Sequence, residues 1–539
     1  MAKDYSHLSK QELLRKIEKL ESRKKYGLIW DEERTKEKFE KDAENALPVL
    51  KEIKGKEIKS GSDQPMNVLI EGDNYHALSV LNFTHRGKID VIYIDPPFNT
   101  GNKDFYYNDS YVDREDAYRH SKWLSFMKKR LALAKNLLSD EGSIFIQIDS
   151  NEGAQLKLLM DEIFGEQYFR NQITWQRSSS GKTTSRNISE DTDYIIWYSK
   201  GEDYIFNKVY KPLAETTKRM YSKDDHDGRG LYRLYPLQKT GGPGPATTYD
   251  YIDNNGRVWK CPAKGWRMRK EKLKILENEG RLSFGGKTLS EKAYWNERDS
   301  EGQIANNLWN DIPNIQGSSR EKVDFAGGQK PIALIQRILE MTSRKNSIVV
   351  DFFAGSGTTG HSVLEMNKSD GGNRQFILCT NNDGDICTKI CYPRIMKAIK
   401  DYKNSKGKKM NGLSGNLKYF KTSFVKKSLS KDDLKIRITH ECTEMLCLRE
   451  GIFDEVKSTG DYKIFKQANR IMGVYYSLDR AALKNLKKEL EKMIGEKILY
   501  CFTLDPLGLD KSDFADWNGV SLEPIPQKIL DVYEQIYEY

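Results

Sequence analysis

The sequence predicts an α/β protein whose main domain is a largely parallel sheet covered by helices. Short continuous apolar runs alternate with stretches of helical periodicity in residues 61–170 and again in residues 321–405. Continuous apolar strands are what a parallel sheet buried on both faces requires. Neither stretch alone holds enough strands for an ordinary doubly wound sheet, so we expect the two halves to form one sheet around the segment between them.

The length and composition of the chain limit its class. At 539 residues and 62.3 kDa it is long enough for two to four domains. Its 38% apolar, 11% aromatic and 31% charged residues exclude collagen-like and largely disordered proteins. The net charge of +10 is compatible with a polyanionic partner without establishing one.

No apolar run approaches the length of a membrane-spanning helix, and the charged start MAKDYSHLSK differs from a signal peptide. We therefore expect no membrane contact and a cytoplasmic location. The seven cysteines form no CxxC pair and the seven histidines are scattered, so we expect no metal site.

The predicted elements begin with an N-terminal helical arm over residues 1–60, where charge is dense and apolar residues recur at helical spacing. Residues 61–170 then predict the strand VLIEGDN, the helix HALSVLNF and the strand KIDVIYID. A helix through WLSFMKKRLALAKNLL follows, and SDEG is expected to end it. The strand SIFIQIDS and a helix through LKLLMDEIF complete this half.

Residues 171–320 break the rhythm with segments such as RSSSGKTTSRN and GGPGPATTYD, which predict an irregular, loop-rich insertion. The rhythm returns in residues 321–405 with the helix KPIALIQRILEMTS, the strand SIVVDFF, the helix HSVLEMNK and the strand RQFILCT. A lysine- and glycine-containing stretch then predicts a linker into a mixed α+β domain over residues 406–539.

The motif Asp95-Pro96-Pro97-Phe98 directly follows the predicted strand VIYI, where open α/β sheets place their ligands. Two prolines fix φ and remove two backbone donors, so Asp95 and the carbonyl of Pro96 can only accept hydrogen bonds. Phe98 offers a face on which a base can stack. The motif therefore predicts a site for an aromatic amine, and a purely structural turn is the alternative.

A second motif, DFFAGSGTT from Asp351 to Thr359, follows an apolar strand and precedes a helix. Its glycines allow a close approach to a ligand, and the helix start offers unpaired N–H groups. A nucleotide and a carboxylate-bearing cofactor both remain open at this point. The strand RQFILCT is not followed by the acid typical of NAD-binding proteins, which disfavours NAD.

DPPF followed far downstream by FAGSG resembles the β-class of amino-group DNA methyltransferases, which use S-adenosylmethionine. The likeness continues through VLIEGDNYHAL, RLALAKNLLSDEGSIFIQID and QKPIALIQRIL. It implies a Rossmann-like methyltransferase domain with a permuted motif order: the catalytic motif first, an inserted target-recognition domain second, and the cofactor loop third. The phrases CLREGIFD and EPIPQKILDVY also resemble the modification (Mod) subunit of Type III restriction-modification systems.

The resemblance implies roles for single positions. The catalytic motif would be Asp95, Pro96, Pro97 and Phe98. The residues that would bind the cofactor are Asp73, Asp95, Lys330, Asp351, Phe353, Ala354, Gly355, Ser356, Gly357, Thr358 and Asn381. Family members hold the ribose hydroxyls with an acid after the strand that is RQFILCT here; this chain has Asn381 there instead, so either Asn381 substitutes or the contact comes from elsewhere.

The chemistry of these groups predicts a mechanism. An exocyclic amino nitrogen is a poor nucleophile because its lone pair is delocalised, and two acceptors would draw its hydrogens and favour a tetrahedral nitrogen. Neither a metal nor a covalent intermediate is then needed, because positioning contributes most of the acceleration. The target base would be flipped out and stacked on Phe98. The resemblance favours adenine N6, since cytosine enzymes more often begin this motif with Ser.

Residues 171–320 are the expected target-recognition domain. Basic residues are interleaved with Trp259 and Trp266 there, a mixture suited to phosphate contacts and base stacking. The predicted DNA-binding residues are Arg177, Lys182, Arg186, Lys264 and Arg267. A phosphate-binding P-loop at GKT is rejected, because Gln176 stands where the first glycine should be.

The predicted function is sequence-specific adenine-N6 methylation of double-stranded DNA by the modification and recognition subunit of a Type III system. The family implies a homodimer, and cleavage would require a separate helicase-nuclease restriction subunit. One alternative is a solitary regulatory adenine methyltransferase. Another, of a different class, is a DNA-binding specificity subunit that has lost its activity.

Overall fold

The structure is a computed structural model of the chain. It describes residues 9–21, 27–32, 35, 37, 46–61, 64–102, 104–107, 110–178, 188–213, 215–286, 288–315, 328–403, 409–428, 430–505 and 508–537. The chain divides into a larger unit, residues 1–207 and 307–539, and a smaller unit, residues 208–306. The DPPF and glycine motifs both belong to the larger unit.

Ten strands form the main sheet of the larger unit, in the order β1-β21-β2-β18-β17-β3-β6-β8-β7-β16. From β21 to β6 all neighbours are parallel, and β1 and β8 run antiparallel to theirs. The sheet therefore combines strands from both predicted halves, which confirms the α/β prediction. The strands are β1 (Ala46–Glu52), β2 (Met66–Glu71), β3 (Ile89–Ile94), β6 (Leu138–Ile148), β7 (Phe169–Gln176), β8 (Thr192–Ser199), β16 (Leu308–Trp309), β17 (Ile348–Asp351), β18 (Gln375–Thr380) and β21 (Asn416–Lys426).

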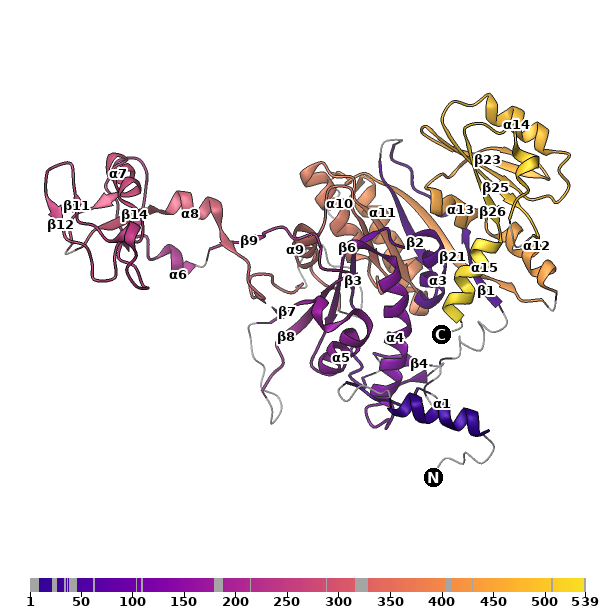
Figure 1. The fold of residues 1–539 in the computed structure, drawn as a ribbon, viewed down its shortest axis with the longest axis horizontal. Coiled ribbons are helices and arrows are strands. Elements are labelled where there is room, and N and C mark those ends of the chain that lie inside the picture. Colours follow the sequence, from indigo (N-terminus) through magenta and orange to yellow (C-terminus); the bar gives the residue numbers. More distant parts are fainter. Residues whose placement is uncertain are drawn as a thin grey trace. The chain divides into compact units, whose positions relative to one another are not determined.

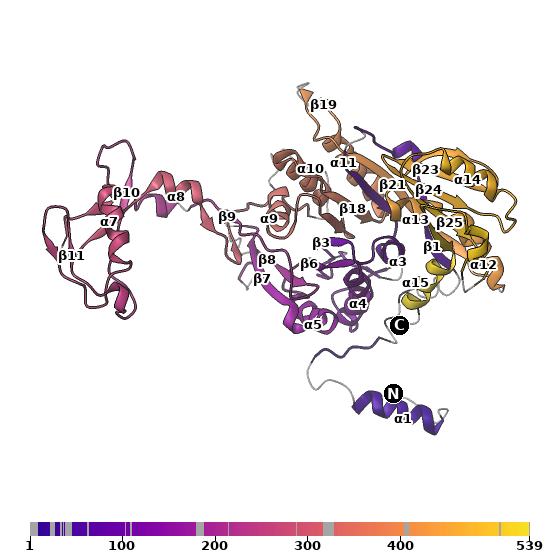
Figure 2. The same ribbon diagram turned by 45° about the horizontal axis from the view of Figure 1, so that its top comes forward.

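Helices cover both faces of this sheet (Figures 1 and 2). On one face α3 (Asn74–Thr84), α4 (Arg119–Leu137) and α5 (Gly153–Phe164) pack side by side. On the other, α10 (Thr358–Asp370) packs between α9 (Ile332–Thr342) and α11 (Tyr392–Ile399). Since both faces are covered, the central strands are buried on both sides, which explains their continuous apolar sequence.

The direction in which successive strands are added to the sheet reverses between β3 and β17. From β3 it passes through α4 to β6 on one side, and from β17 it passes through α10 to β18 on the other. The two strands are parallel neighbours, with Val91 opposite Val349 and Ile92 opposite Val350. Open α/β sheets bind ligands outside the carboxyl ends of the strands at such a switch point. Both predicted motifs begin at this point.

Two segments differ from the expected elements. The residues SDEG do not separate the helix from the next strand, because β6 begins at Leu138 directly after α4 and the register shifts between Leu138 and Ser143. SDEG thus forms an irregularity within β6. In the expected helical arm, α1 (Lys10–Glu21) is a helix, whereas β1 pairs with β21 at the edge of the sheet. An edge strand tolerates the proline at position 48.

The C-terminal part of the larger unit contains a second, five-stranded sheet in the order β22-β23-β24-β25-β26. Its helices α13 and α15 pack on α3, which covers the main sheet. The remaining elements of this unit are β4 (Tyr106–Tyr107), β5 (Ser110–Tyr111), β19 (Tyr402–Lys403), β20 (Lys409–Met410), α12 (Lys431–Glu441), α13 (Thr443–Glu450), β22 (Asp454–Ser458), β23 (Tyr462–Gln467), β24 (Arg470–Tyr475), α14 (Leu483–Glu491), β25 (Glu496–Phe502), β26 (Val520–Ile525) and α15 (Gln527–Tyr537).

The smaller unit, residues 208–306, lies within the expected insertion of residues 171–320, whose first strands β7 and β8 join the main sheet instead. Its elements are short, as the irregular sequence predicts. They are β9 (Tyr210–Lys211), α6 (Glu215–Lys218), β10 (Tyr232–Pro236), β11 (Tyr251–Ile252), β12 (Val258–Trp259), α7 (Lys270–Asn278), β13 (Leu282–Ser283), β14 (Ser290–Tyr294), α8 (Trp295–Glu301) and β15 (Gln303–Ile304).

Two tryptophans of the smaller unit belong to its core. Trp259 is 5% exposed and Trp266 is fully buried. Their indole N–H groups donate to Asp253 Oδ2 at 2.9 Å and to the carbonyl of Tyr249 at 2.7 Å. The expectation that these two residues stack on bases is therefore wrong: an irregular unit with short strands needs large aromatic side chains to fill its core.

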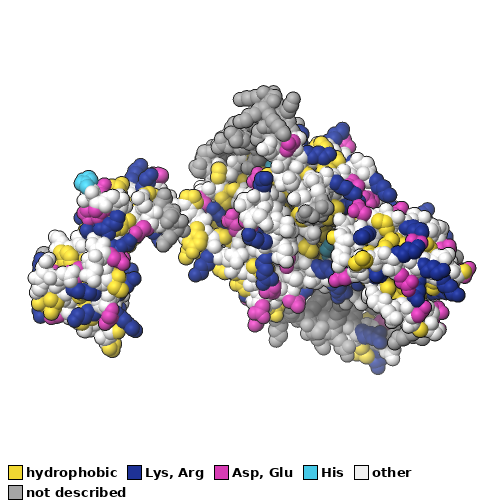
Figure 3. All heavy atoms as spheres, turned by 90° about the horizontal axis from the view of Figure 1, so that it is seen from above, with side chains coloured by type: hydrophobic (Ala, Val, Ile, Leu, Met, Phe, Trp, Pro, Cys, Tyr) yellow, Lys and Arg dark blue, Asp and Glu magenta, His cyan; other side chains and the backbone are white. Residues whose placement is uncertain are grey.

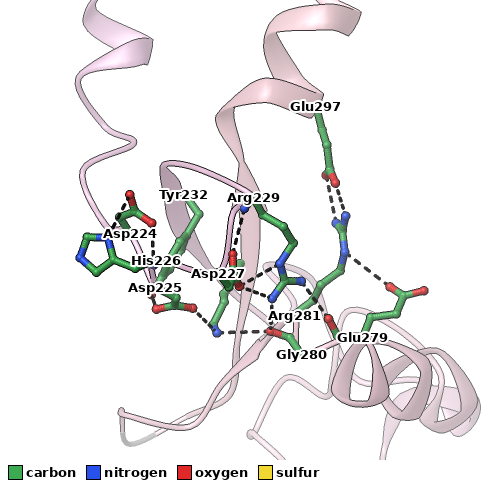
Figure 4. Close-up of polar contacts among 11 residues, drawn as sticks. Asp224, Asp225, His226, Asp227, Arg229, Tyr232, Glu279, Gly280, Arg281 and Glu297 are labelled. Atoms are coloured by element: carbon green, nitrogen blue, oxygen red, sulfur yellow. Dashed lines mark hydrogen bonds and ion pairs between the residues drawn. The ribbon is translucent and has the colours of Figure 1, made fainter.

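Ion pairs also stabilise the smaller unit (Figure 4). Arg229 pairs with Asp227 at 2.6 Å, and Arg281 pairs with Glu297. Both guanidinium groups lie beside the ring of Tyr294, at 4.7 and 5.4 Å from its centroid. These cations are engaged within the unit. Figure 3 shows further Lys and Arg side chains, in dark blue, across the visible face of this unit.

Among the described residues, no helix combines the length and the apolar content that a bilayer crossing requires.

Candidate active site

Asp95 follows the last residue of β3, and its two carboxylate oxygens differ in their surroundings. Oδ2 accepts a hydrogen bond from Nζ of Lys330 at 2.6 Å. Oδ1 is buried and has no hydrogen-bond partner among the described residues. Burial raises the pKa of Asp95, and the positive charge of Lys330 opposes this shift. One oxygen is thus anchored, while the other remains available as an acceptor for a ligand.

The rest of the DPPF motif is fixed from two sides. The indole N–H of Trp123 on α4 donates to the carbonyl of Pro97 at 2.7 Å. Nζ of Lys330 lies 5.0 Å from the centroid of the Phe98 ring. Phe98 is half-buried and Pro96 is buried. Lys330 thus lies near both the Phe98 ring and Oδ2 of Asp95.

Asn99, the residue after the motif, adopts a left-handed backbone conformation with φ of 57°. Its amide donates to Oε1 of the buried Glu152 at 2.5 Å. Nδ1 of His120 lies 2.7 Å from the same oxygen. Burial raises the pKa of Glu152. This cluster was not predicted, because His120 lies on α4 and Glu152 lies just before α5, and no local spacing joins them to the motif.

Asp351 closes β17 and organises the glycine loop. Its Oδ1 accepts from the backbone N–H of Phe353 at 3.0 Å, and its Oδ2 accepts from Oγ1 of Thr359 at 2.6 Å. Burial raises the pKa of Asp351 to about 7, and the nearby charge of Asp95 acts in the same direction. The two carboxylates therefore belong to one electrostatic site, on the neighbouring strands β3 and β17.

The glycine at position 357 is required by the backbone. It caps the start of α10 with φ of 78°, and a Cβ there would meet Cys391 Sγ at 3.0 Å. Nη1 of the buried Arg394 donates to Ser356 Oγ at 3.0 Å and to Thr358 Oγ1 at 2.8 Å. The predicted loop residues are thus held by a cation of α11 that the sequence analysis did not identify.

Asp73 lies at the turn between β2 and α3, where it caps the helix through the N–H of Tyr75 at 2.8 Å. The adjacent Asn74 donates to the carbonyl of Phe352 at 3.0 Å. Arg130 on α4 donates to Asn74 Oδ1 at 2.5 Å and lies 3.4 Å from Asp73 Oδ2. These contacts bring the Asp73 turn to the glycine loop, which sequence spacing alone could not establish.

Asn381 immediately follows β18, whose last residue is joined to the Asp73 turn by the hydrogen bond from Gly72 N–H to the carbonyl of Thr380 at 3.0 Å. Asn381 is exposed, and its amide donates to Asp383 Oδ2 at 2.5 Å. The exposed Asn381 and the half-exposed Asp73 therefore follow two neighbouring strands, β18 and β2.

The residues at the switch point fit S-adenosylmethionine. The start of α10 has no side-chain cap, so its first N–H groups can bind a carboxylate, and the buried Asp351 lies at the same loop. Polar groups of Asp73 and Asn381 follow the next strands, β2 and β18. The free Oδ1 of Asp95 is at the neighbouring strand. This donor set matches the two ends of an amino acid joined to a nucleoside.

The predicted DNA-binding residues fall in different parts of the chain. Arg177 follows β7, donates to the carbonyl of Glu190 at 2.8 Å and lies 3.4 Å from Asp193. Lys182 and Arg186 lie outside the described residues. Lys264 and Arg267 are exposed on the smaller unit, and neither takes part in an ion pair of the described residues.

Comparison with known proteins places this geometry in a family. Residues 89–391, more than half of the chain, match the family model described as DNA methylase, so the chain belongs to this family. It is 31% identical over 398 residues to the Type II methyltransferase M.KpnI of Klebsiella pneumoniae, covering 67% of this chain and 90% of that protein. The predicted relationship to DNA methyltransferases is therefore confirmed.

The chain is also 36% identical over 350 residues to the Type III restriction-modification enzyme StyLTI Mod subunit of Salmonella typhimurium. The match covers 58% of this chain and 52% of that subunit, so the chain spans about half of that relative's length. Among solved structures, the cytosine-N4-specific PvuII DNA methyltransferase is 13% identical with a TM-score of 0.34, covering 63% of this chain and 93% of that one. The family assignment rests on the sequence matches.

Proposed function

We propose that the chain is a sequence-specific DNA methyltransferase that transfers a methyl group from S-adenosylmethionine to N6 of adenine. One observation carries this proposal: the free, buried Oδ1 of Asp95 lies at the end of β3, next to the strand that ends in Asp351 and the glycine loop. An acceptor for an amine and a loop suited to an amino-acid cofactor thus share one switch point, in a chain of the DNA methylase family.

S-adenosylmethionine, when bound, supplies an activated methyl group. Asp95 Oδ1 and the carbonyl of Pro96 accept the two hydrogens of the target amino group, which localises the nitrogen lone pair. Phe98 stacks on the base and fixes its plane. Asp95 holds the proton that the amine loses, and its raised pKa suits that role. Because a paired base cannot reach this position, the target base is flipped out of the duplex.

Adenine is the proposed base because the motif begins with Asp95 rather than Ser. Double-stranded DNA is the proposed substrate. The exposed Lys264 and Arg267 of the smaller unit are the proposed phosphate contacts, together with Arg177, Lys182 and Arg186.

The similarity to a Type III Mod subunit supports a further proposal: that the chain dimerises and works with a helicase-nuclease restriction subunit. The cytoplasm is the proposed location, since all seven cysteines are free thiols in the structure. The match to 90% of M.KpnI supports a second candidate, a methyltransferase that is not part of a Type III enzyme. Co-purification with a large helicase-nuclease partner from the native host would distinguish the two.

The test is transfer of labelled methyl groups to DNA, followed by nucleoside analysis of the product. The wild type should yield N6-methyladenine, and Asp95→Ala should abolish transfer while calorimetry still detects the cofactor. Asp203→Ala, at an exposed position of the larger unit, is the matched control. Methyl transfer by Asp95→Ala at the wild-type rate, or a product methylated only at cytosine, would contradict the proposal.

A further inference from the structure

We propose that Lys330 is a positioning residue of methyl transfer, which holds one oxygen of Asp95 so that the other alone receives the target amine. The inference rests on the proposed function and assigns to Lys330 a role toward the catalytic carboxylate rather than toward the cofactor. Its basis is the asymmetry of Asp95: Nζ of Lys330 lies 2.6 Å from Oδ2, and Oδ1 is buried without a partner among the described residues.

Lys330 lies just before α9, on a rigid part of the backbone. Pro331 has φ of −66° and caps the start of α9, whose residues Ile335, Ile338 and Leu339 are fully buried. The helix packs against β3, the strand that Asp95 directly follows. The Lys330 side chain is 12% exposed and that of Asp95 is 21% exposed. A partly buried pair held by two packed elements costs less side-chain entropy than a pair on the surface.

The charges that face Asp95 come from several strands, and Lys330 differs from the rest in sign. Asp193 on β8 and Asp351 at the end of β17 are both acidic and interact with Asp95. Tyr93 on β3 is buried near the same carboxylates. Among the described residues, Lys330 makes the ion pair with Asp95. Without that cation, burial and two like charges would favour the protonated acid, and a neutral carboxyl is a weaker hydrogen-bond acceptor than a carboxylate.

The location of the ammonium group also defines the side from which the base enters. Nζ of Lys330 lies 5.0 Å from the centroid of Phe98, so it takes part of the space around that ring. An amine that approaches Asp95 from the same side would meet a competing hydrogen-bond donor. The free Oδ1 therefore marks the side for the base, and Lys330 acts through Asp95 without touching the reacting amine.

The experiment compares Lys330→Met with Lys330→Arg in the full chain. Met has a similar length without the charge, whereas Arg keeps it. At saturating cofactor we expect Lys330→Met to lower kcat about tenfold or more at neutral pH, with little change in the KM for DNA. The acid limb of its pH–rate profile should move to higher pH, so that part of the activity returns in alkaline buffer. Lys330→Arg should restore most of kcat and the wild-type profile.

Three controls keep the test decisive. Lys345→Met, near the other end of α9, removes an exposed lysine that donates to the carbonyl of Asp370, and should leave kcat unchanged. Calorimetry with S-adenosylmethionine should show the cofactor affinity of Lys330→Met within about threefold of wild type. Thermal unfolding reports whether the variant is folded, and Lys330→Gln serves as the second neutral variant if Lys330→Met is not.

Two results would overturn the assignment. A neutral variant with an unshifted pH profile, whose loss lies wholly in cofactor affinity, would make Lys330 a cofactor ligand. A higher kcat in Lys330→Met or Lys330→Gln than in the wild type would show that the Lys330 ammonium group hinders entry of the base. Failure of the proposed function is visible separately, because the wild type itself would then methylate no DNA.

Discussion

Asn99 reaches across from the DPPF loop to Glu152, and its amide nitrogen lies 2.5 Å from Glu152 Oε1. Asn99 makes this contact from a backbone with φ of 57°, a region that few residues other than glycine adopt at little cost. The contact joins the chain that leaves the motif to the residue before α5. The position of Phe98 therefore depends on a carboxylate far along the sequence.

Glu152→Ala should lower both stability and activity, because it removes the shorter hydrogen bond of the buried Asn99 amide and leaves the 3.3 Å bond to the carbonyl of Arg119. We expect a loss of about 1–3 kcal/mol in the free energy of unfolding and a larger fall in kcat than in cofactor affinity. Glu152→Gln retains an oxygen at this position and should recover much of both. Gln155→Ala, which removes a contact of 3.5 Å to His120, is the control. Equal activity of Glu152→Ala and wild type would exclude this anchoring role.

The raised pKa of Asp351 predicts how stability depends on pH. The folded carboxyl titrates at about 7, whereas the unfolded one titrates near 3.8. Between these values the folded state keeps a proton that the unfolded state has lost, so stability falls as pH rises through this window and is level above it. Between pH 5 and pH 8 this fall amounts to about 3 kcal/mol, and Asp351→Asn should remove it. Urea unfolding of both proteins at pH 5 and pH 8 measures it, and parallel pH curves would contradict the shift.

Alanine substitutions at Gly357 and Gly371 distinguish the cost of backbone strain from the cost of a steric contact made by the new Cβ. Both have positive φ, 78° and 67°, at opposite ends of α10. A Cβ at Gly357 would meet Cys391 Sγ at 3.0 Å, whereas one at Gly371 meets nothing within 4 Å. Gly371→Ala should cost about 1 kcal/mol from backbone strain alone. Gly357→Ala should cost more and also weaken cofactor binding in calorimetry. Equal losses of stability and cofactor affinity in the two variants would show that the Cys391 side chain moves aside at no cost in free energy.

The smaller unit should supply much of the electrostatic affinity for DNA. Its residues 208–306 contain 20 Lys and Arg against 13 Asp and Glu, a net charge of +7, whereas the whole chain carries +10. Lys264→Ala and Arg267→Ala should each weaken binding to DNA of any sequence and reduce the slope of log affinity against log salt by about 1. Arg229→Ala, which removes a cation already paired with Asp227 (Figure 4), should leave that slope unchanged. If only Arg229→Ala reduced the slope of log affinity against log salt, Lys264 and Arg267 would not be phosphate contacts.

The main sheet was predictable because buried strands carry a continuous apolar signal. VIYI and SIVVD could be recognised as strands, and the acids that follow them had to lie at one edge of a parallel sheet. The edge strand β1 was not predictable in the same way. Its sequence ALPVLKE contains a proline and polar ends, and its partner β21 lies far along the chain.

The motifs of the candidate site could be predicted from the sequence, but the side chains that hold those motifs in place could not. Asp95 and Asp351 follow strands and stand in short patterns, whereas Arg130, Glu152 and Arg394 act through contacts between elements. Side chains of this second kind leave no local signal, since a buried charge is specified by its partner in space. The same reason explains Trp259 and Trp266, whose core role appears only once the small strands around them are assembled.

Strand β2 pairs with β18 on one side and β21 on the other, and both are synthesised hundreds of residues after it. During translation the edges of the early strands therefore remain unpaired, and their apolar side chains remain exposed, until residues up to Lys426 have been synthesised. Fragments that stop before that point would expose those edges and aggregate, so attempts to express the N-terminal half by itself should give insoluble protein.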